Sequence, residues 1–87
     1  LKPHKPASHR RARAERYVAK ASSTLTRLQI LSGDAETRRV LELARSYVED
    51  AKFFLNSDMA DDSLIAVSYA EGLLDCLRAL GKVEFTW

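Results

Sequence analysis

Apolar residues recur at three- and four-residue steps along most of the chain, which is the spacing of amphipathic α-helices. In the segment 8–31 they share one helical face: Ala14, Tyr17, Val18, Ala21, Thr24, Leu25 and Leu28. The segment 34–56 has a broader apolar face: Val40, Leu41, Leu43, Ala44, Tyr47, Val48, Ala51, Phe54 and Leu55. In 59–80, apolar residues cover well over half of the circumference: Ile65, Ala66, Val67, Tyr69, Ala70, Leu73, Leu74, Cys76, Leu77 and Leu80. This third helix is expected to be the most buried.

Each predicted helix starts near a residue that can cap it. Ser8 is the expected N-cap of the first helix, and Pro6 is expected to prevent an earlier start. Asp34 is the expected N-cap of the second helix. Asp58 and Asp61 together resemble a capping arrangement for the third helix.

Two glycines mark helix ends, and the connections between the helices are short. Gly33 and Gly81 tolerate the left-handed backbone that terminates helices. Sequential helices joined by short loops pack as antiparallel neighbours. No alternating run predicts a strand. The sequence therefore predicts an all-α, up-down-up three-helix bundle with a short C-terminal tail, as a single domain over 8–87 after a flexible basic segment, 1–7.

Two motifs resemble a known family. The third helix contains Tyr-Ala-Glu-Gly-Leu-Leu-Asp at 69–75, and the second contains Tyr-Val-Glu-Asp-Ala-Lys-Phe-Phe-Leu at 47–55. Together with Trp87, they resemble the archaeal family called domain of unknown function 357. Its members are small three-helix bundles with no assigned activity, so the resemblance implies the same bundle and assigns no function to any residue. The resemblance covers mainly 40–87 and leaves the first helix unmatched.

Three aromatic residues lie outside the predicted apolar faces. Phe53 projects from the polar side of the second helix and needs a cover. Phe85 and Trp87 close the tail, and each would forgo roughly 2–3 kcal/mol if it stayed exposed. We expect the tail to fold back over the bundle, with Phe53 as one place to pack. The alternative is that these aromatic residues stay exposed until a partner chain covers them.

Gly72 lies in the middle of the third helix, where glycine costs about 1 kcal/mol relative to alanine. The favoured interpretation is steric, with a side chain such as Tyr47 or Trp87 packed against the bare backbone. The alternative is a groove for a ligand or a second protomer.

Two carboxylates flank this glycine on the expected exposed edge. Glu71 and Asp75 lie one turn apart, with Ser68 and Arg78 nearby. Two such acids can bind a metal or divide acid and base roles. No histidine shares their helix, and Asp75 can pair with Arg78 at three-residue spacing. We therefore favour solvated charges over a metal site.

The charge of the chain is uneven although its net value is only +2. Residues 1–20 hold seven Lys or Arg against one acid, and residues 21–87 hold seven against eleven. One flank of the first helix carries a basic stripe that could contact successive phosphates: Arg10, Arg13, Arg16, Lys20 and Arg27. No aromatic is interleaved for base stacking. The less specific explanations are solubility and docking onto the acidic body of a second copy.

Catalytic and metal-binding signatures are missing from the sequence. It contains no phosphate loop, dinucleotide fingerprint, nucleophile elbow or zinc-hydrolase helix. His4 and His9 sit in a basic stretch with no complementary ligands, so zinc is not expected. Cys76 is the single cysteine, which excludes an intrachain disulfide and favours a small buried apolar role. We therefore expect no enzyme activity, metal or cofactor.

The expected role is that of a non-catalytic protein-interaction module. It would present one edge to an unknown protein partner or to a second copy: Phe53, Ser68, Glu71, Gly72, Asp75 and Trp87. The alternative is a nucleic-acid-associated accessory protein that uses the basic stripe. No apolar run approaches the roughly 20 residues that span a bilayer, so we expect no membrane contact and a cytoplasmic location. The chain begins at Leu1 without a methionine, which leaves open whether residues precede it.

Overall fold

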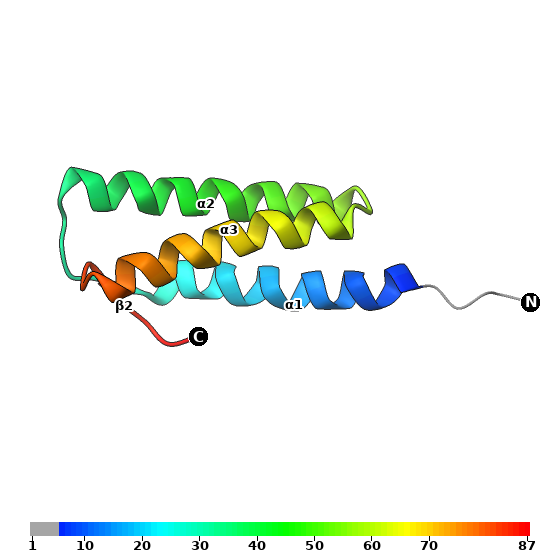
Figure 1. Ribbon diagram of the computed structural model, residues 1–87, viewed down its shortest axis with the longest axis horizontal. Coiled ribbons are helices and arrows are strands. Elements are labelled where there is room, and N and C mark those ends of the chain that lie inside the picture. The colour runs from blue at the N-terminus through cyan, green and yellow to red at the C-terminus, as the bar shows by residue number, and fades with distance from the viewer. Residues whose placement is uncertain (1–5) are drawn as a thin grey trace, which may run out of the picture.

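Three helices run antiparallel in chain order, as the sequence predicts (Figure 1). The computed structural model describes the backbone of residues 6–87 and the side chains of residues 9–87. The helices are α1 (Pro6–Arg27), α2 (Ala35–Asn56) and α3 (Ala60–Ala79). The most extensive packing joins α2 to α3, and α1 contacts both. The fold is an all-α three-helix bundle with a short C-terminal tail.

The N-terminus of α1 differs from the prediction. The helix begins at Pro6, before the predicted cap Ser8. Proline suits the first turn of a helix because its fixed φ is already helical and its missing N–H has no partner there. Pro6 and Ala7 thus belong to α1, whereas residues 1–5 of the predicted flexible segment lie outside the described residues.

The end of α1 corrects a second prediction. The helix ends at Arg27 and not at Leu31, and β1 (Gln29–Ile30) pairs antiparallel with β2 (Val83–Glu84). The Leu31 amide also donates to the Lys82 carbonyl at 2.9 Å. The expectation of no strand was therefore wrong, because two residues are too few to show alternation. This pairing joins the tail to the α1–α2 connection.

Asp34 is the N-cap of α2, as predicted. Its carboxylate accepts from the Thr37 amide at 2.7 Å and from the Ser32 hydroxyl at 2.7 Å. Lys82 Nζ also donates to Asp34, at 3.1 Å, from the far end of the chain. The Ser32 hydrogen bond, followed by those from Thr37 and Lys82, holds the pKa of Asp34 well below its ordinary value of 3.8.

This lowered pKa predicts an acid-labile contribution to stability. Because the carboxylate is favoured in the folded state, the contribution is complete above about pH 4 and is lost as the pH falls further toward the folded-state pKa. The Asp34→Asn variant keeps a capping oxygen but cannot titrate. Chemical denaturation between pH 6 and pH 2 should show a smaller loss for Asp34→Asn than for the native chain. Identical pH slopes would contradict the assignment.

In the turn from α2 to α3, Asp58 does not have the predicted role of a cap for α3. Asp58 has a φ of 61°, in the left-handed region. Its amide donates to the Leu55 carbonyl at 3.2 Å, and the Met59 amide donates to Phe54 at 2.8 Å. This is the hydrogen-bond pattern of a Schellman motif. Asp58 therefore terminates α2, and no side chain caps α3, whose N-cap position is Met59.

Replacement of Asp58 by glycine should stabilise the protein. Glycine adopts the left-handed conformation without the steric penalty of a Cβ atom, and the gain should be about 0.5–1 kcal/mol. The variant also loses an exposed Arg11–Asp58 ion pair of 3.7 Å, which contributes little. The measurement is urea denaturation of Asp58→Gly beside Asp58→Ala. Destabilisation of the glycine variant would show that the ion pair outweighs the backbone.

Gly81 ends α3 as predicted. Its φ is 73°, the Gly81 amide donates to the Arg78 carbonyl, and the Lys82 amide donates to Leu77 at 2.9 Å. This second Schellman motif turns the chain back so that Val83 pairs with Ile30.

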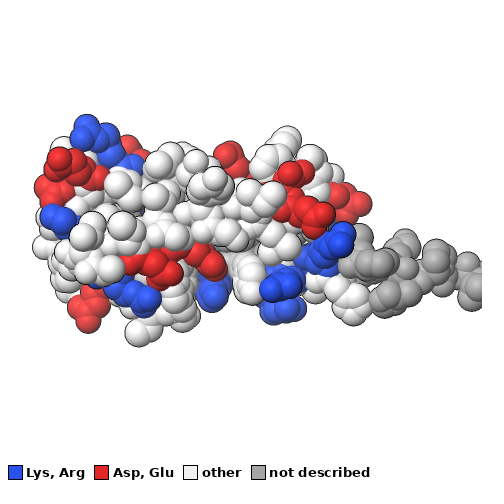
Figure 2. Space-filling view, in the orientation of Figure 1, with Lys and Arg blue, Asp and Glu red and all other residues white. Residues whose placement is uncertain are grey.

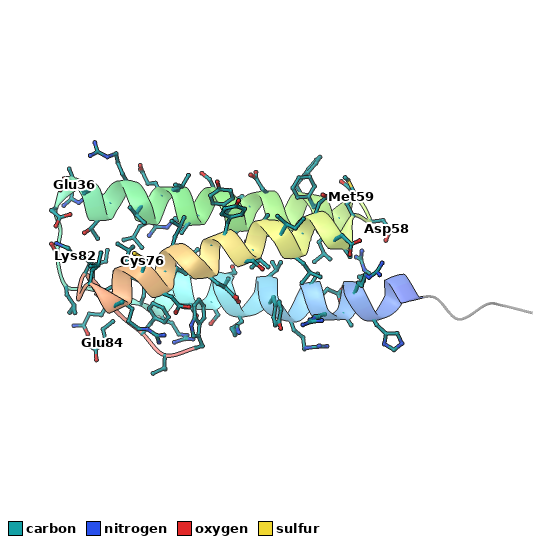
Figure 3. The ribbon with its side chains drawn as sticks, in the orientation of Figure 1. Glu36, Asp58, Met59, Cys76, Lys82 and Glu84 are labelled. Carbon is teal, nitrogen blue, oxygen red and sulfur yellow. The ribbon has the colours of Figure 1, made fainter. Side chains whose placement is uncertain are left out.

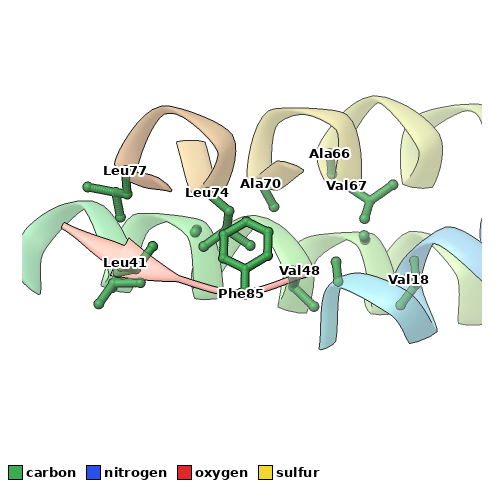
Figure 4. Packing of buried hydrophobic residues seen from close by; sticks show 13 residues of the cluster. Val18, Leu41, Val48, Ala66, Val67, Ala70, Leu74, Leu77 and Phe85 are labelled. Atoms are coloured by element: carbon green, nitrogen blue, oxygen red, sulfur yellow. The ribbon is translucent and has the colours of Figure 1, made fainter. Parts of the chain in front are cut away.

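The core lies along the common axis of the three helices (Figure 4). Alanine occupies core positions on every helix and brings the helix axes close together: Ala14, Ala21, Ala44, Ala51, Ala66 and Ala70. Larger residues fill the space between them: Val18, Leu41, Val48, Val67, Leu74 and Leu77. The buried Ser63 hydroxyl donates to the Ala51 carbonyl at 2.8 Å, which satisfies it and joins α3 to α2.

The aromatic tail folds back onto the bundle, as expected. Phe85 is 7% exposed within the core, and Arg78 lies over its ring at 4.6 Å. Trp87 packs edge-on against Phe85 and donates from Nε1 to Asp75 at 2.9 Å. The tail does not cover Phe53, which is 65% exposed.

Candidate interaction surface

The outer side of α3 is exposed although it is uncharged. From residue 65 to residue 80 this side carries exposed residues without an acid or a base, and we call them the α3 stripe: Ile65, Ser68, Tyr69, Gly72, Cys76, Ala79 and Leu80. Figure 2 shows a broad uncharged area over the middle of this face. Among the described side chains α3 has more buried residues than α1 or α2, as expected, but α1 and α2 cover only one side of it and leave the α3 stripe exposed.

Gly72 lies near the middle of the α3 stripe. A Cβ atom built on it would meet nothing within 4 Å, so the steric interpretation was wrong. Cys76, one turn further on, is exposed and not buried as expected (Figure 3). The backbone at Gly72 is therefore open to close approach from outside the chain.

The stripe includes large aromatic and aliphatic side chains. Tyr69 stacks on Tyr47 of α2, with ring centroids 5.2 Å apart and planes 15° from parallel. Leu64, Ile65, Ser68 and Tyr69 line a shallow, mostly apolar depression. Ile65 and Tyr69 are each 59% exposed, and Leu80 is 65% exposed. Such a concentration of exposed apolar side chains is typical of an interaction surface.

Phe53 stays uncovered on α2. Its ring makes an edge contact with Phe54, at a centroid distance of 5.7 Å. The sequence predicted that Phe53 needs a cover, but no described part of the chain covers it.

Glu71 and Asp75 do not form a paired-carboxylate site. Lys20 Nζ lies 3.6 Å from Glu71 Oε2, a buried atom that accepts no hydrogen bond from the described residues. Asp75 accepts from Arg78 at 3.0 Å and from Trp87 Nε1. Both acids thus join parts of the protein. Within residues 9–87, no three His, Cys, Asp or Glu side chains are grouped so that they could hold a metal ion.

The residues of the predicted interaction edge therefore lie in separate places and do not form one surface. Ser68 and Gly72 lie on the α3 stripe, whereas Glu71 and Asp75 bind α1 and the tail. Sequence reasoning missed Ile65, Tyr69, Cys76 and Leu80 as surface residues and assigned them to the core. The sequence did contain a signal for this exposure. Apolar positions extend around more of α3 than two neighbouring helices can cover.

Three residues of the predicted basic stripe have partners within the chain. Arg10 lies 3.6 Å from Asp61. Lys20 pairs with Glu71 and lies over the Trp87 ring at 5.3 Å. Arg27 donates to the Trp87 carbonyl at 3.4 Å. These cations hold the bundle and tail together, which reduces what they offer to phosphates.

Arg13 and Arg16 remain exposed on the outer side of α1. Arg13 lies over the Tyr17 ring at 5.7 Å, and neither arginine forms an ion pair with a described residue. His9 is also exposed, and His4 falls outside the described residues.

Comparison with known proteins identifies a family to which the chain belongs. The sequence profile of the family described as "Protein of unknown function (DUF357)" matches residues 16–83, and the chain belongs to this family. This result confirms the family resemblance and extends it into α1. No curated protein and no solved structure gives a significant match. Among the described helices, none is long and apolar enough to cross a membrane.

Proposed function

We propose that this DUF357 member is a non-catalytic module that binds another protein through the α3 stripe. The observation that carries the proposal is the uncharged, exposed side of α3, with Gly72 open at its middle. Water-exposed apolar side chains on a small bundle favour burial against a partner. A cytoplasmic location, drawn from the sequence, forms part of the same proposal.

The arrangement of polar groups around the stripe supports a binding role over a structural one. Charges on the α1 side of α3 already have partners in the chain, as Glu71 has Lys20 and Asp75 has Arg78. The stripe itself presents only uncharged groups. A protein surface of matching shape can bury such groups without leaving a charge unpaired.

Site-specific photo-cross-linking tests this function. A photoreactive amino acid placed at position 72, in cells that make the protein, should yield a covalent protein adduct on irradiation. The matched control carries the same group at Ala12, which is exposed on α1. The proposal requires clearly more protein adduct from position 72 than from position 12. Equal yields at the two positions would overturn it.

A second candidate function is phosphate binding by α1. The observation that favours it is the pair Arg13 and Arg16, exposed and without ion pairs in the described part of the chain. Two exposed cations of this kind would support weak, salt-sensitive contact with nucleic acid. We rank it second because Arg10, Lys20 and Arg27 are engaged within the chain.

Fluorescence anisotropy with labelled single-stranded RNA and duplex DNA tests this alternative. Micromolar binding should weaken steeply with salt and should fall for Arg13→Ala combined with Arg16→Ala. Arg38→Ala combined with Arg39→Ala, on α2, is the charge-matched control. Absence of binding at low salt, or equal loss in both double variants, would exclude α1 as a nucleic-acid site.

A further inference from the structure

We infer that the partner of this module presents an acidic segment, in which a carboxylate pairs with Arg13 while a neighbouring apolar side chain enters the depression on α3. This inference rests on the proposed function and names the chemistry of its partner. Two features of the molecule carry it, namely the ion pairs that join α1 to α3 and the apolar depression that lies between them.

Ion pairs join α1 to α3 at two levels. The two helices run side by side in the same direction (Figure 1). Arg10 lies 3.6 Å from Asp61, and Lys20 lies 3.6 Å from Glu71. Both pairs join residues that are 51 positions apart in the sequence, so the helices keep one register along this length. Each residue of α1 in this region is therefore level with the residue of α3 that comes 51 positions later.

Arg13 lies between these two levels and has no acid opposite it. On the helical wheel it falls between the two paired cations, so it belongs to the flank of α1 that faces α3. The register places Leu64 at the level of Arg13, and Ser68 at the level of Tyr17. Arg13 forms no ion pair with a described residue, and its guanidinium lies over the Tyr17 ring at 5.7 Å. A carboxylate from outside the chain would complete the row of ion pairs.

The apolar depression opens at the same level of α3. Its volume is about 390 Å³, and four residues line it: Leu64, Ile65, Ser68 and Tyr69. Such a space can receive an apolar side chain, and its lining offers no charge of its own. A segment bound there would place an apolar group on α3 and bring its carboxylate to Arg13.

The charges around Arg13 favour an anionic group. The acids of the two neighbouring ion pairs already have cations of α1 as partners. Asp62 lies nearly opposite residue 64 on the helical wheel, on the side of α3 away from α1. Arg16, one turn from Arg13, is exposed and also forms no ion pair with a described residue. Complementary charge on a partner would set its register on this surface.

An acidic protein segment fits both features better than the other occupants do. A phosphate backbone would use the cations and leave the apolar depression in water. A wholly apolar segment would cover the depression and leave Arg13 without a counter-charge at the edge of the contact, which is costly where water is excluded. A carboxylate beside an apolar side chain satisfies both.

Peptide selection tests the chemistry of the partner. A random-peptide library displayed on phage, selected against the purified chain, should become enriched in Asp or Glu close to Leu, Ile or Phe. A synthetic peptide from this selection should bind more weakly as salt is added. Arg13→Gln should raise its dissociation constant at least about tenfold, whereas Arg39→Gln, at an exposed arginine of α2, should leave it unchanged. Absence of enrichment, selection of basic peptides, or equal effects of the two variants would overturn the inference.

Ser68→Glu tests the position of the site. Helical side chains lean toward the N-terminus of their helix, so a carboxylate introduced at position 68 would reach toward the level of Arg13. It should compete with the selected peptide and raise the dissociation constant at least about tenfold. Ser46→Glu, the same change on α2, should have no effect, and both variants should fold because both serines are exposed. Unchanged affinity of Ser68→Glu, or displacement of the peptide by single-stranded RNA, would overturn the acidic partner.

The photo-cross-link at position 72 separates this inference from the proposed function. The yield of protein adduct in cells should fall for Arg13→Gln and stay the same for Arg39→Gln. A full yield from Arg13→Gln would overturn the acidic partner and leave the interaction module standing. Absence of any adduct above the position-12 control would overturn both.

Discussion

Leu74→Ala is expected to lower the free energy of unfolding by about 3–5 kcal/mol. Leu74 is fully buried on the core side of α3, where truncation removes apolar contacts and leaves a cavity between α2 and α3. A domain of 87 residues has a total stability of roughly 4–13 kcal/mol, so the variant should lie close to unfolding. Thermal denaturation followed by circular dichroism should show a midpoint at least about 12 °C lower.

The matched control is Leu31→Ala. Leu31 is 53% exposed and lies outside the α3 stripe. Its replacement by alanine removes the same side-chain volume as Leu74→Ala. Its effect should stay within about 0.5 kcal/mol. A comparable loss in both variants would show that the core is not centred on Leu74, and the arrangement of helices described above would then be wrong.

Phe85→Ala is expected to cost about 3 kcal/mol, although Phe85 belongs to the short tail that follows α3. Its ring is 7% exposed, packs against the core and lies under the Arg78 guanidinium. Losing the ring should also release Trp87, which makes an edge contact with it. Urea denaturation monitored by Trp87 fluorescence should report both the lower stability and a more exposed tryptophan in the native baseline.

Phe53→Ala provides the control for the tail. Phe53 is 65% exposed, so the same truncation should change stability by no more than about 0.5 kcal/mol. If Phe85→Ala cost as little as Phe53→Ala, the tail could not be an integral part of the core. The comparison therefore decides whether the last residues belong to the domain.

The local sequence pattern was sufficient to predict the helices and several of their ends. The 3.6-residue period placed all three, Asp34 capped α2, and Gly81 terminated α3, because these features depend on a few neighbouring residues. The same local reasoning failed at Asp58, where the backbone conformation and not the side chain decides the turn. It also failed at the two-residue strands, which exist only because the tail returns to the α1–α2 connection.

Tertiary structure alone decided which side of each element is covered. Helical periodicity shows that apolar residues cover well over half of the circumference of α3, but it cannot tell how many neighbours a helix has. Packing assigned Leu74 to the core and left Ile65, Tyr69 and Leu80 in solvent. Packing also places Lys20 beside Glu71, although the sequence indicated Lys20 as a candidate phosphate contact. Ion pairs between helices depend on the three-dimensional arrangement and cannot be derived from local pattern. The sequence by itself determined the elements of this protein, and the packing of three helices determined which of their residues remain free to bind.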